Sequence, residues 1–308
     1  MSRFREYTKL NRIVAKYGIG YLDDKLKGIS ATDLVVIGAR SGAGKSTLSK
    51  IISLANPNTK IKLFSLENFK DDDYAKECYF EYKKKSGESL CMVETLTGVN
   101  TNKINSSMLE EVETCVEKKF SHIGVVNRQD GFNVNKLRDD MIRAAEDGYE
   151  LIILDHLDYL DKVDERDSDN QHISIIMKTI RKIQETDNIP IIAVSHLRKG
   201  TGREAPVVPN MDEFIGSSNK VKEATVVITF APDDKTNEKA NSEPIKATWC
   251  CIRKSRRIGI DNKVARLYFD TRVDKYQNDP DICVVNYSGT KIGKYIDGEL
   301  VWEKNDEK

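Results

Sequence analysis

Short apolar runs alternate along the chain with longer segments in which apolar and polar residues recur at helical spacing. The runs have the length of single strands, and the longer segments match amphipathic helices. Strands are predicted over 34–37, 60–66, 123–126, 150–155, 189–195, 225–230, 246–252 and 263–269, and helices over 68–85, 134–145 and 173–186. Strands that alternate with helices in this way favour an α/β fold with parallel strands at its centre.

The N-terminal segment precedes this pattern. Between Ser2 and Tyr17, the apolar residues Phe4, Leu10, Ile13 and Val14 recur at roughly helical spacing among basic residues. This spacing predicts a short amphipathic helix ahead of the core. The apolar side of such a helix can pack on its own domain or dock on a neighbouring subunit, and the pattern leaves both readings open.

The run over 34–37 leads into a stretch of small residues, GARSGAGKST. Small residues let backbone N–H groups wrap around a triphosphate, and the following helix points its partially positive end at the same anion. Lys45 can reach the outer phosphates, and the Ser46 hydroxyl can bind Mg²⁺. A chance glycine-rich turn would need neither the preceding strand nor the closing Gly-Lys-Ser-Thr. The residues expected around the nucleotide are Ala39, Ser41, Gly42, Ala43, Gly44, Lys45, Ser46 and Thr47.

One position departs from the usual form of this loop. The pattern normally begins with glycine, and this chain has Ala39 there. Because Gly42, Ala43 and Gly44 keep the rest of the loop small, we expect the alanine to be tolerated.

Polar and charged residues follow three of the predicted strands. Asp155 closes the run ELIILD, and the carboxyl ends of parallel strands are where α/β proteins bind ligands. An aspartate at a strand end is common by chance, but beside a phosphate loop it is a natural second partner for Mg²⁺, through water and opposite Ser46. Glu67 follows KIKLFSL, and His196 follows IPIIAVS. Taken singly, these two residues could equally be a solvated charge and a structural histidine.

Two basic segments of the chain are further candidates for a functional role. Beyond His196 lies a long polar stretch, LRKGTGREAPVVPNMDEFIGSSNK, which carries Arg198, Lys199 and Arg203. A loop this long in a compact domain is usually functional or disordered. The turn RKSRRIG joins the last two predicted strands.

The amino-acid composition limits the kinds of function that the chain can have. The 308 residues include 49 basic and 49 acidic side chains and a formal net charge of +0, so any attraction to a polyanion must come from a local surface. The six cysteines show no CxxC spacing, which argues against a zinc site or a disulfide framework. The charged N-terminus and the lack of a run of membrane-spanning length predict a soluble, cytoplasmic protein.

The order of these parts resembles the RecA-like motor domain of the DnaB family of ring helicases, including the helicase half of phage primase-helicases. The resemblance is carried by GIGYLDDKLKG, DLVVIGARSGAGKST, FSLEN, LIILDHLDYL, IIAVSHLRKG, IGSSNKVKEATVVI and IRKSRRIG. It spans 17–276 and implies an α/β, RecA-like P-loop NTPase with a mostly parallel central sheet flanked by helices. The implied organisation is a helical segment over 1–17, an ATPase domain over 18–276 and an extension over 277–308, where ICVVNY could add a strand.

The resemblance also implies a role for each matching residue. Glu67 would be the general base for the attacking water, and His196 the sensor of the γ-phosphate. Arg256 would be an arginine finger for a neighbouring subunit's nucleotide, with Lys254 as its companion, whereas the plain alternative is a solvated basic turn. Relatives tend to carry glutamine where this chain has Lys222. The resemblance therefore does not imply, for this position, a contact with the neighbouring subunit's nucleotide. The residues expected to contact DNA are Arg198, Lys199, Arg203, Gly216 and Ser217.

Two hypotheses of different classes follow. The first is a Mg²⁺-dependent, ATP-hydrolysing homo-hexameric helicase that translocates on single-stranded DNA in phage or plasmid replication, in the cytosol of a bacterial host. A separate primase or loader would be its partner. The second is a RecA-like ATPase whose nucleotide state controls a DNA-binding scaffold without strand separation. The combination of SHLRKG with IRKSRRIG favours the helicase.

Overall fold

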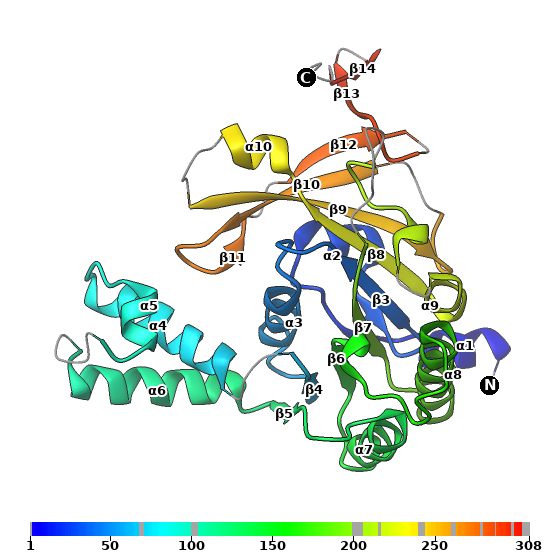
Figure 1. The fold of residues 1–308 in the computed structure, drawn as a ribbon, viewed down its shortest axis with the longest axis horizontal. Coiled ribbons are helices and arrows are strands. Elements are labelled where there is room, and N and C mark those ends of the chain that lie inside the picture. The colour runs from blue at the N-terminus through cyan, green and yellow to red at the C-terminus, as the bar shows by residue number, and fades with distance from the viewer. Residues whose placement is uncertain are drawn as a thin grey trace.

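A computed structural model describes residues 2–67, 71–99, 104–198, 206–214, 217–239, 244–259, 263–277, 280–286, 288–296 and 299–303. A large twisted sheet runs through the described chain, with helices packed on both of its faces (Figure 1). The strand order is β14-β13-β12-β10-β9-β8-β3-β7-β6-β4-β5, and β11 pairs with β10.

The strands that hold the functional residues form the parallel half of this sheet. They are β8 (Val226–Pro232), β3 (Leu34–Ala39), β7 (Ile191–His196), β6 (Leu151–Asp155), β4 (Ile61–Ser65) and β5 (Ile123–Asn127). Along β3, Val35 and Ile37 join the apolar cluster on one face, and Leu34 and Val36 join the cluster on the other. Successive side chains of a strand point to opposite faces, so a central parallel strand must be apolar on both.

Beyond β8 the sheet continues with antiparallel strands. They are β9 (Ile245–Ser255), β10 (Lys263–Asp270), β11 (Lys275–Tyr276), β12 (Asp281–Val285), β13 (Ile292–Ile296) and β14 (Glu299–Trp302). Strand β12 confirms that ICVVNY adds a strand. The α/β fold with a parallel centre is therefore as predicted, and an antiparallel extension carries the sheet further.

Helices cover the two faces of the parallel half. On one face, α2 (Gly20–Leu26) and α3 (Lys45–Leu54) pack through residues such as Leu22, Leu48 and Ile52. On the other face lie α7 (Val134–Glu146) and α8 (Asp169–Asp187), and the short helix α9 (Ser217–Glu223) packs beside α8. The predicted helices over 134–145 and 173–186 are therefore present, and α8 begins a turn earlier at the capping box of Ser168 and Gln171.

One group of helices stands apart from this body. Figure 1 shows α4 (Asp72–Ser86), α5 (Met92–Leu96) and α6 (Ser106–Phe120) projecting to the left of the sheet. Helices α4 and α6 hold each other through a small apolar cluster of Cys78, Tyr82, Val112 and Val116. The helix predicted over 68–85 corresponds to α4 from Asp72 onward.

The N-terminal prediction is partly wrong. Helix α1 (Arg3–Leu10) ends at Asn11, and the next residues form strand β1 (Ile13–Ala15), which pairs with β2 (Ile29–Ser30). The β-branched residues Ile13 and Val14 favour a strand, and pairing with β2 overrides the helical spacing. None of the residues of α1 is buried.

Two expected loops contain short helices. The stretch between the strands predicted over 225–230 and 246–252 holds α10 (Asp234–Lys239). The long polar stretch after His196 holds the turn η3 (Met211–Glu213), which is closed by a capping box between Asn210 and Glu213. Among the described residues, no helix combines the length and apolar character needed to cross a membrane.

Candidate nucleotide-binding site

The phosphate loop follows β3 directly and leads into α3, as predicted. Gly42 and Gly44 have φ angles of 79° and 78°, a left-handed conformation that favours glycine. Ala39 is the last residue of the extended strand β3, so its position makes no such demand and alanine fits there. Arg40 fixes the start of the loop, since its guanidinium lies 2.7 Å from the Glu213 carboxylate.

The carboxyl ends of four adjacent strands bring the other predicted residues to this loop. In the register of the sheet, Ala39 lies opposite His196, and Ser65 at the end of β4 lies opposite Asp155. Burial lowers the pKa of the Lys45 ammonium, while the nearby carboxylates of Glu67 and Asp155 act in the opposite direction. The structure therefore brings the predicted lysine, glutamate, aspartate and histidine into one site.

Asp155 has the surroundings expected of a metal ligand. Its side chain is 3 % exposed, and its Oδ1 atom has no hydrogen-bond partner among the described residues. Burial raises the pKa of Asp155 to about 6. A buried carboxylate oxygen without a donor is suited to a hard cation such as Mg²⁺. Ser46, the second ligand predicted from the sequence, lies in the first turn of α3.

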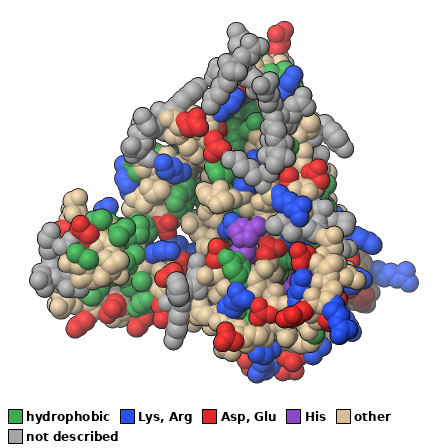
Figure 2. Space-filling view, viewed as in Figure 1, with side chains coloured by type: hydrophobic (Ala, Val, Ile, Leu, Met, Phe, Trp, Pro, Cys, Tyr) green, Lys and Arg blue, Asp and Glu red, His purple; other side chains and the backbone are tan. Residues whose placement is uncertain are grey.

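Glu67 and His196 meet through a third side chain, His156. The His156 ring is 0 % exposed, its Nε2 atom lies 3.3 Å from the Glu67 carboxylate, and its ring centroid is 4.1 Å from that of His196. The ligand atoms of the three residues lie within 4.8 Å of one another, a spacing at which imidazole and carboxylate groups can also hold a metal ion. Burial, with the neighbouring His156 and Lys45, lowers the pKa of His196, which therefore stays neutral near pH 7. Histidine side chains come to the surface near the middle of the face in Figure 2, among acidic and basic groups.

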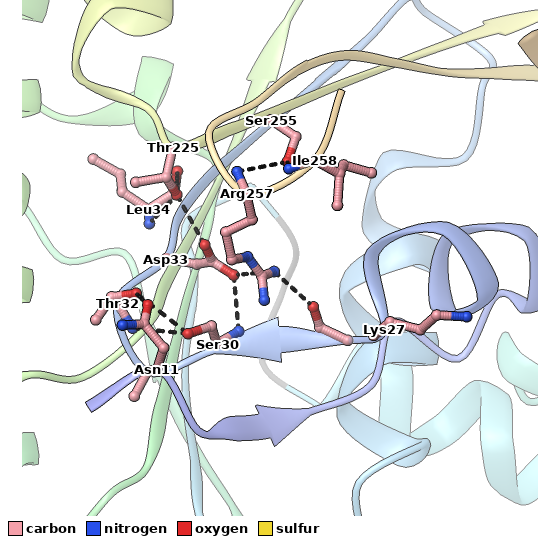
Figure 3. A network of polar contacts seen from close by, with 12 residues as sticks. Asn11, Lys27, Ser30, Thr32, Asp33, Leu34, Thr225, Ser255, Arg257 and Ile258 are labelled. Carbon is pink, nitrogen blue, oxygen red and sulfur yellow. Dashed lines mark hydrogen bonds and ion pairs between the residues drawn. The ribbon is translucent and has the colours of Figure 1, made fainter. Parts of the chain in front are cut away.

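The basic segment RKSRRIG, expected to be a turn, begins inside β9, which runs to Ser255, and its three arginines are in different situations. Arg253 donates to the carbonyl oxygens of Val208 and Pro209 at 2.9 and 2.8 Å. Arg257 pairs with the buried Asp33 at 2.7 Å, as Figure 3 shows, and it donates to the Gly28 carbonyl at 3.0 Å.

Arg256, by contrast, is exposed. Its guanidinium donates to the Lys222 carbonyl at 3.2 Å, and the Lys254 ammonium donates to the carbonyls of Val221 and Lys222. Two of the three arginines are thus fixed within the chain, and Arg256 presents its charge outward.

This turn lies at the opposite end of the strands from the phosphate loop. The Arg256 amide donates to the Thr225 carbonyl, and the Thr225 hydroxyl accepts from the Leu34 amide at the start of β3. The phosphate loop follows the other end of β3, which is 6 residues long. At about 3.3 Å per residue the two ends are roughly 17 to 20 Å apart. Arg256 therefore does not reach the phosphate loop of its own chain.

The comparisons with known proteins agree with this geometry. Residues 15–278 match the family model described as the DnaB-like helicase C terminal domain. The chain belongs to this family. The resemblance expected over 17–276 is confirmed.

Curated DnaB-family relatives are distant but cover most of the chain. The replicative DNA helicase DnaB of Rickettsia typhi is 22 % identical over 288 residues, which is 85 % of this chain and 56 % of that protein. The probable plasmid replicative DNA helicase of Chlamydia muridarum is 23 % identical over 270 residues, which is 83 % of this chain and 53 % of that protein. The chain thus spans about half the length of these relatives.

Solved structures show the same fold. One that is described as an ATPase domain has a TM-score of 0.70 and 17 % identity, covering 90 % of this chain and 95 % of that one. A DnaB-like replicative helicase, described together with its interactions with primase, has a TM-score of 0.69 and 18 % identity, covering 90 % and 65 %. At these identities the likeness concerns the fold, and it confirms the RecA-like architecture.

The structure describes some of the residues that are expected to contact DNA. The Arg198 side chain is exposed, and its backbone amide is held by the Glu213 carbonyl at 2.9 Å. Ser217 opens α9. Lys199, Arg203 and Gly216 lie outside the described residues. The aromatic ring of Phe214 is 2 % exposed, so it is not available to stack on a base.

Three residues near the site were not singled out from the sequence. His156 and Asp158 follow Asp155 closely, and polar residues inside the apolar run LIILDHLDYL were a signal that could have found them. Lys220 gave no such signal, because it sits in a polar stretch where a lysine is expected to be solvated. In the structure the Lys220 side chain is fully buried.

Proposed function

We propose that this DnaB-family chain is the ATP-hydrolysing motor of a hexameric ring helicase that moves along single-stranded DNA. The observation that carries the proposal is the separation of two half-sites. Lys45, Glu67, Asp155 and His196 meet at the carboxyl ends of the parallel strands, and the exposed Arg256 lies at the amino ends. A second copy is needed to bring the two halves together around one nucleotide.

The nucleotide half binds and activates the triphosphate. Backbone amides of the loop and the Lys45 ammonium hold the phosphates, while Ser46 and Asp155 would hold a Mg²⁺ ion, which would supply positive charge to the phosphates. Glu67 orients a water molecule and takes its proton. The neutral imidazole of His196 donates a hydrogen bond to the γ-phosphate and responds to its loss.

The second half acts on the neighbouring subunit. Arg256 stabilises the charge that develops on the transferred phosphoryl group, and Lys254 lies two residues before it, at the end of β9. Arg198, Lys199 and Arg203 contact DNA phosphates, and the backbone amides of Gly216 and Ser217 add donors. Such contacts are independent of base sequence and sensitive to salt.

We also propose how the subunits contact each other and in which kind of replication the chain acts. Helix α1, which exposes Phe4 (74 %) and Tyr7 (60 %), docks on the next subunit of the ring. Residues 18–276 form the ATPase domain, and 277–308 are an extension to it. The plasmid helicase among the relatives supports a role in phage or plasmid replication, in the cytosol of a bacterial host, with a primase or loader as a separate partner.

A strand-displacement assay on a forked duplex tests the proposal. We expect displacement that requires ATP and Mg²⁺, and a native mass near six protomers with nucleotide and oligo-dT present. The Lys45→Ala variant should bind DNA in the same buffer without displacing a strand. Hydrolysis without displacement by assembled rings would contradict the helicase and favour a nucleotide-controlled scaffold.

A further inference from the structure

Helix α9 carries a buried cation close to the end of β7. The Lys220 side chain is 0 % exposed, and its ammonium donates to the Asp158 carboxylate at 2.6 Å and to the Ser195 hydroxyl at 2.7 Å. Both partners belong to the carboxyl edge of the sheet, since Ser195 precedes His196 and Asp158 lies in the turn η2 (Leu157–Tyr159) after β6. One side chain therefore ties α9 to the edge that holds the nucleotide site.

Asp158 extends this tie to the predicted sensor. Its second oxygen accepts from the His196 backbone amide at 2.8 Å and from the Ser195 hydroxyl at 3.0 Å. Burial alone would raise the pKa of Asp158, but His156 and Lys220 lower it, so the carboxylate stays charged. An ammonium and a carboxylate that are both removed from water are unfavourable apart. The end of β7 and α9 are therefore constrained to move together.

The two residues that follow Lys220 in α9 hold side chains of the basic segment RKSRRIG through their carbonyl groups. The carbonyl of Val221 accepts from the Lys254 ammonium, and the carbonyl of Lys222 accepts from Lys254 at 3.3 Å and from the Arg256 guanidinium at 3.2 Å. Helix α9 has 7 residues. At about 1.5 Å per residue it is roughly 10 Å long. Helix α9 thus runs from the edge with His196 toward the edge with Arg256.

We propose that Lys220 is a positioning residue that transmits the nucleotide state at His196 through α9 to Arg256, which completes the next subunit's site. A displacement of the end of β7 pulls on Asp158 and Lys220, shifts α9, and changes how its last carbonyls hold Lys254 and Arg256. Neighbouring sites then hydrolyse nucleotide in a coordinated order. This inference rests on the proposed ring ATPase and adds the physical connection between its sites.

Lys220→Met in the full chain tests the proposal, and Lys178→Met is the matched control because the Lys178 side chain, on the neighbouring helix α8, is exposed. We expect Lys220→Met to lower the kcat for ATP at least 10-fold and its Hill coefficient to near 1, with KM changed less than 3-fold. Lys178→Met should keep the wild-type kcat and Hill coefficient. Wild-type kcat and cooperativity in Lys220→Met would overturn the inference.

A second variant separates transmission from simple stability. Lys220→Met leaves the Asp158 carboxylate buried without its cation, so Lys220→Met with Asp158→Leu restores a matched apolar pair. We expect the double variant to melt near the wild-type temperature and still lack cooperativity. Recovery of cooperativity together with stability would overturn the inference. Absence of hydrolysis in wild-type rings would overturn the proposed function, whereas wild-type turnover with an unaffected Lys220→Met overturns the inference alone.

Discussion

The two ends of the parallel strands use charged residues in opposite ways. At the carboxyl ends, Asp155, His156 and Asp158 are largely buried, and the His156 ring lies beside the carboxylates of Glu67 and Asp158. At the amino ends, Arg256 is exposed and its side chain makes one hydrogen bond among the described residues, to a backbone carbonyl. Buried groups held by their own chain can bind and polarise a substrate of that chain, and an exposed cation can act on another copy.

The basic turn repeats this contrast at a smaller scale. Arg253, near the end of β9, donates to two carbonyl oxygens, and Arg257 pairs with Asp33, so both side chains are held within the chain. Arg256, which lies between them in the sequence, is exposed and can reach a partner. In the sequence only the family resemblance distinguishes Arg256 from the other two arginines, and the contacts now separate two residues held within the chain from one that can act outside it.

The largest change in ATP turnover is expected for a variant of Arg256, which tests whether this arginine acts on the nucleotide of a neighbouring subunit. Arg256→Ala should lower ATP turnover roughly 1,000- to 100,000-fold, because an arginine finger contributes that much to rate, while nucleotide affinity stays within about 2-fold. Mixing Arg256→Ala with Lys45→Ala subunits should restore part of the turnover, since one protomer supplies a loop and the other a finger. Mixed rings as inactive as either variant would argue against a shared site.

The next effect concerns the carboxyl edge itself. Glu67→Gln keeps the size of the side chain and removes its basicity, so we expect kcat to fall by about 100- to 10,000-fold with nucleotide binding intact. Single-turnover hydrolysis and equilibrium binding of a fluorescent nucleotide measure the two quantities. Unchanged turnover would show that Glu67 is not the base.

A stability measurement sharpens the contrast between the arginines. Arg257→Met leaves the buried Asp33 carboxylate without its partner, which should lower the free energy of unfolding by about 3 kcal/mol. Arg256→Met removes an exposed side chain and should change it by less than about 0.5 kcal/mol. Urea unfolding of the two variants compares them directly. Equal losses would mean that Arg256 also has a structural role.

The smallest effect is a pH dependence at Asp158. Its pKa is lowered in the folded chain, so its contribution to stability is complete above the unfolded value of about 3.9 and is lost as the pH falls through the lower folded value. The variant that combines Lys220→Met with Asp158→Leu lacks this contribution at every pH. Urea unfolding at pH 7 and pH 3 should therefore show a slope against pH that is steeper in the wild type. If stability depended on pH equally in the wild type and the double variant, the charged Asp158 carboxylate would not contribute to stability as proposed.

Predictions from the sequence succeeded where a local rule was sufficient. The phosphate loop, the strand that ends in Asp155 and the parallel centre follow from short-range patterns of apolar and small residues. The prediction of a helix through Tyr17 failed because Ile13 to Ala15 pair with a strand that begins 14 residues after Ala15, at Ile29. The spacing of apolar residues does not reveal such a partner.

The sequence by itself therefore determined which residues of the nucleotide half lie at the ends of strands, because the loop with Lys45 directly follows β3 and Asp155 closes β6. The tertiary structure decided which arginine is exposed, that Arg256 lies a strand's length from its own phosphate loop, and that Lys220 is buried against Asp158. Those properties depend on contacts between residues far apart in the sequence, such as Asp33 with Arg257 and Asp158 with Lys220. Only folding brings such pairs together and removes them from water.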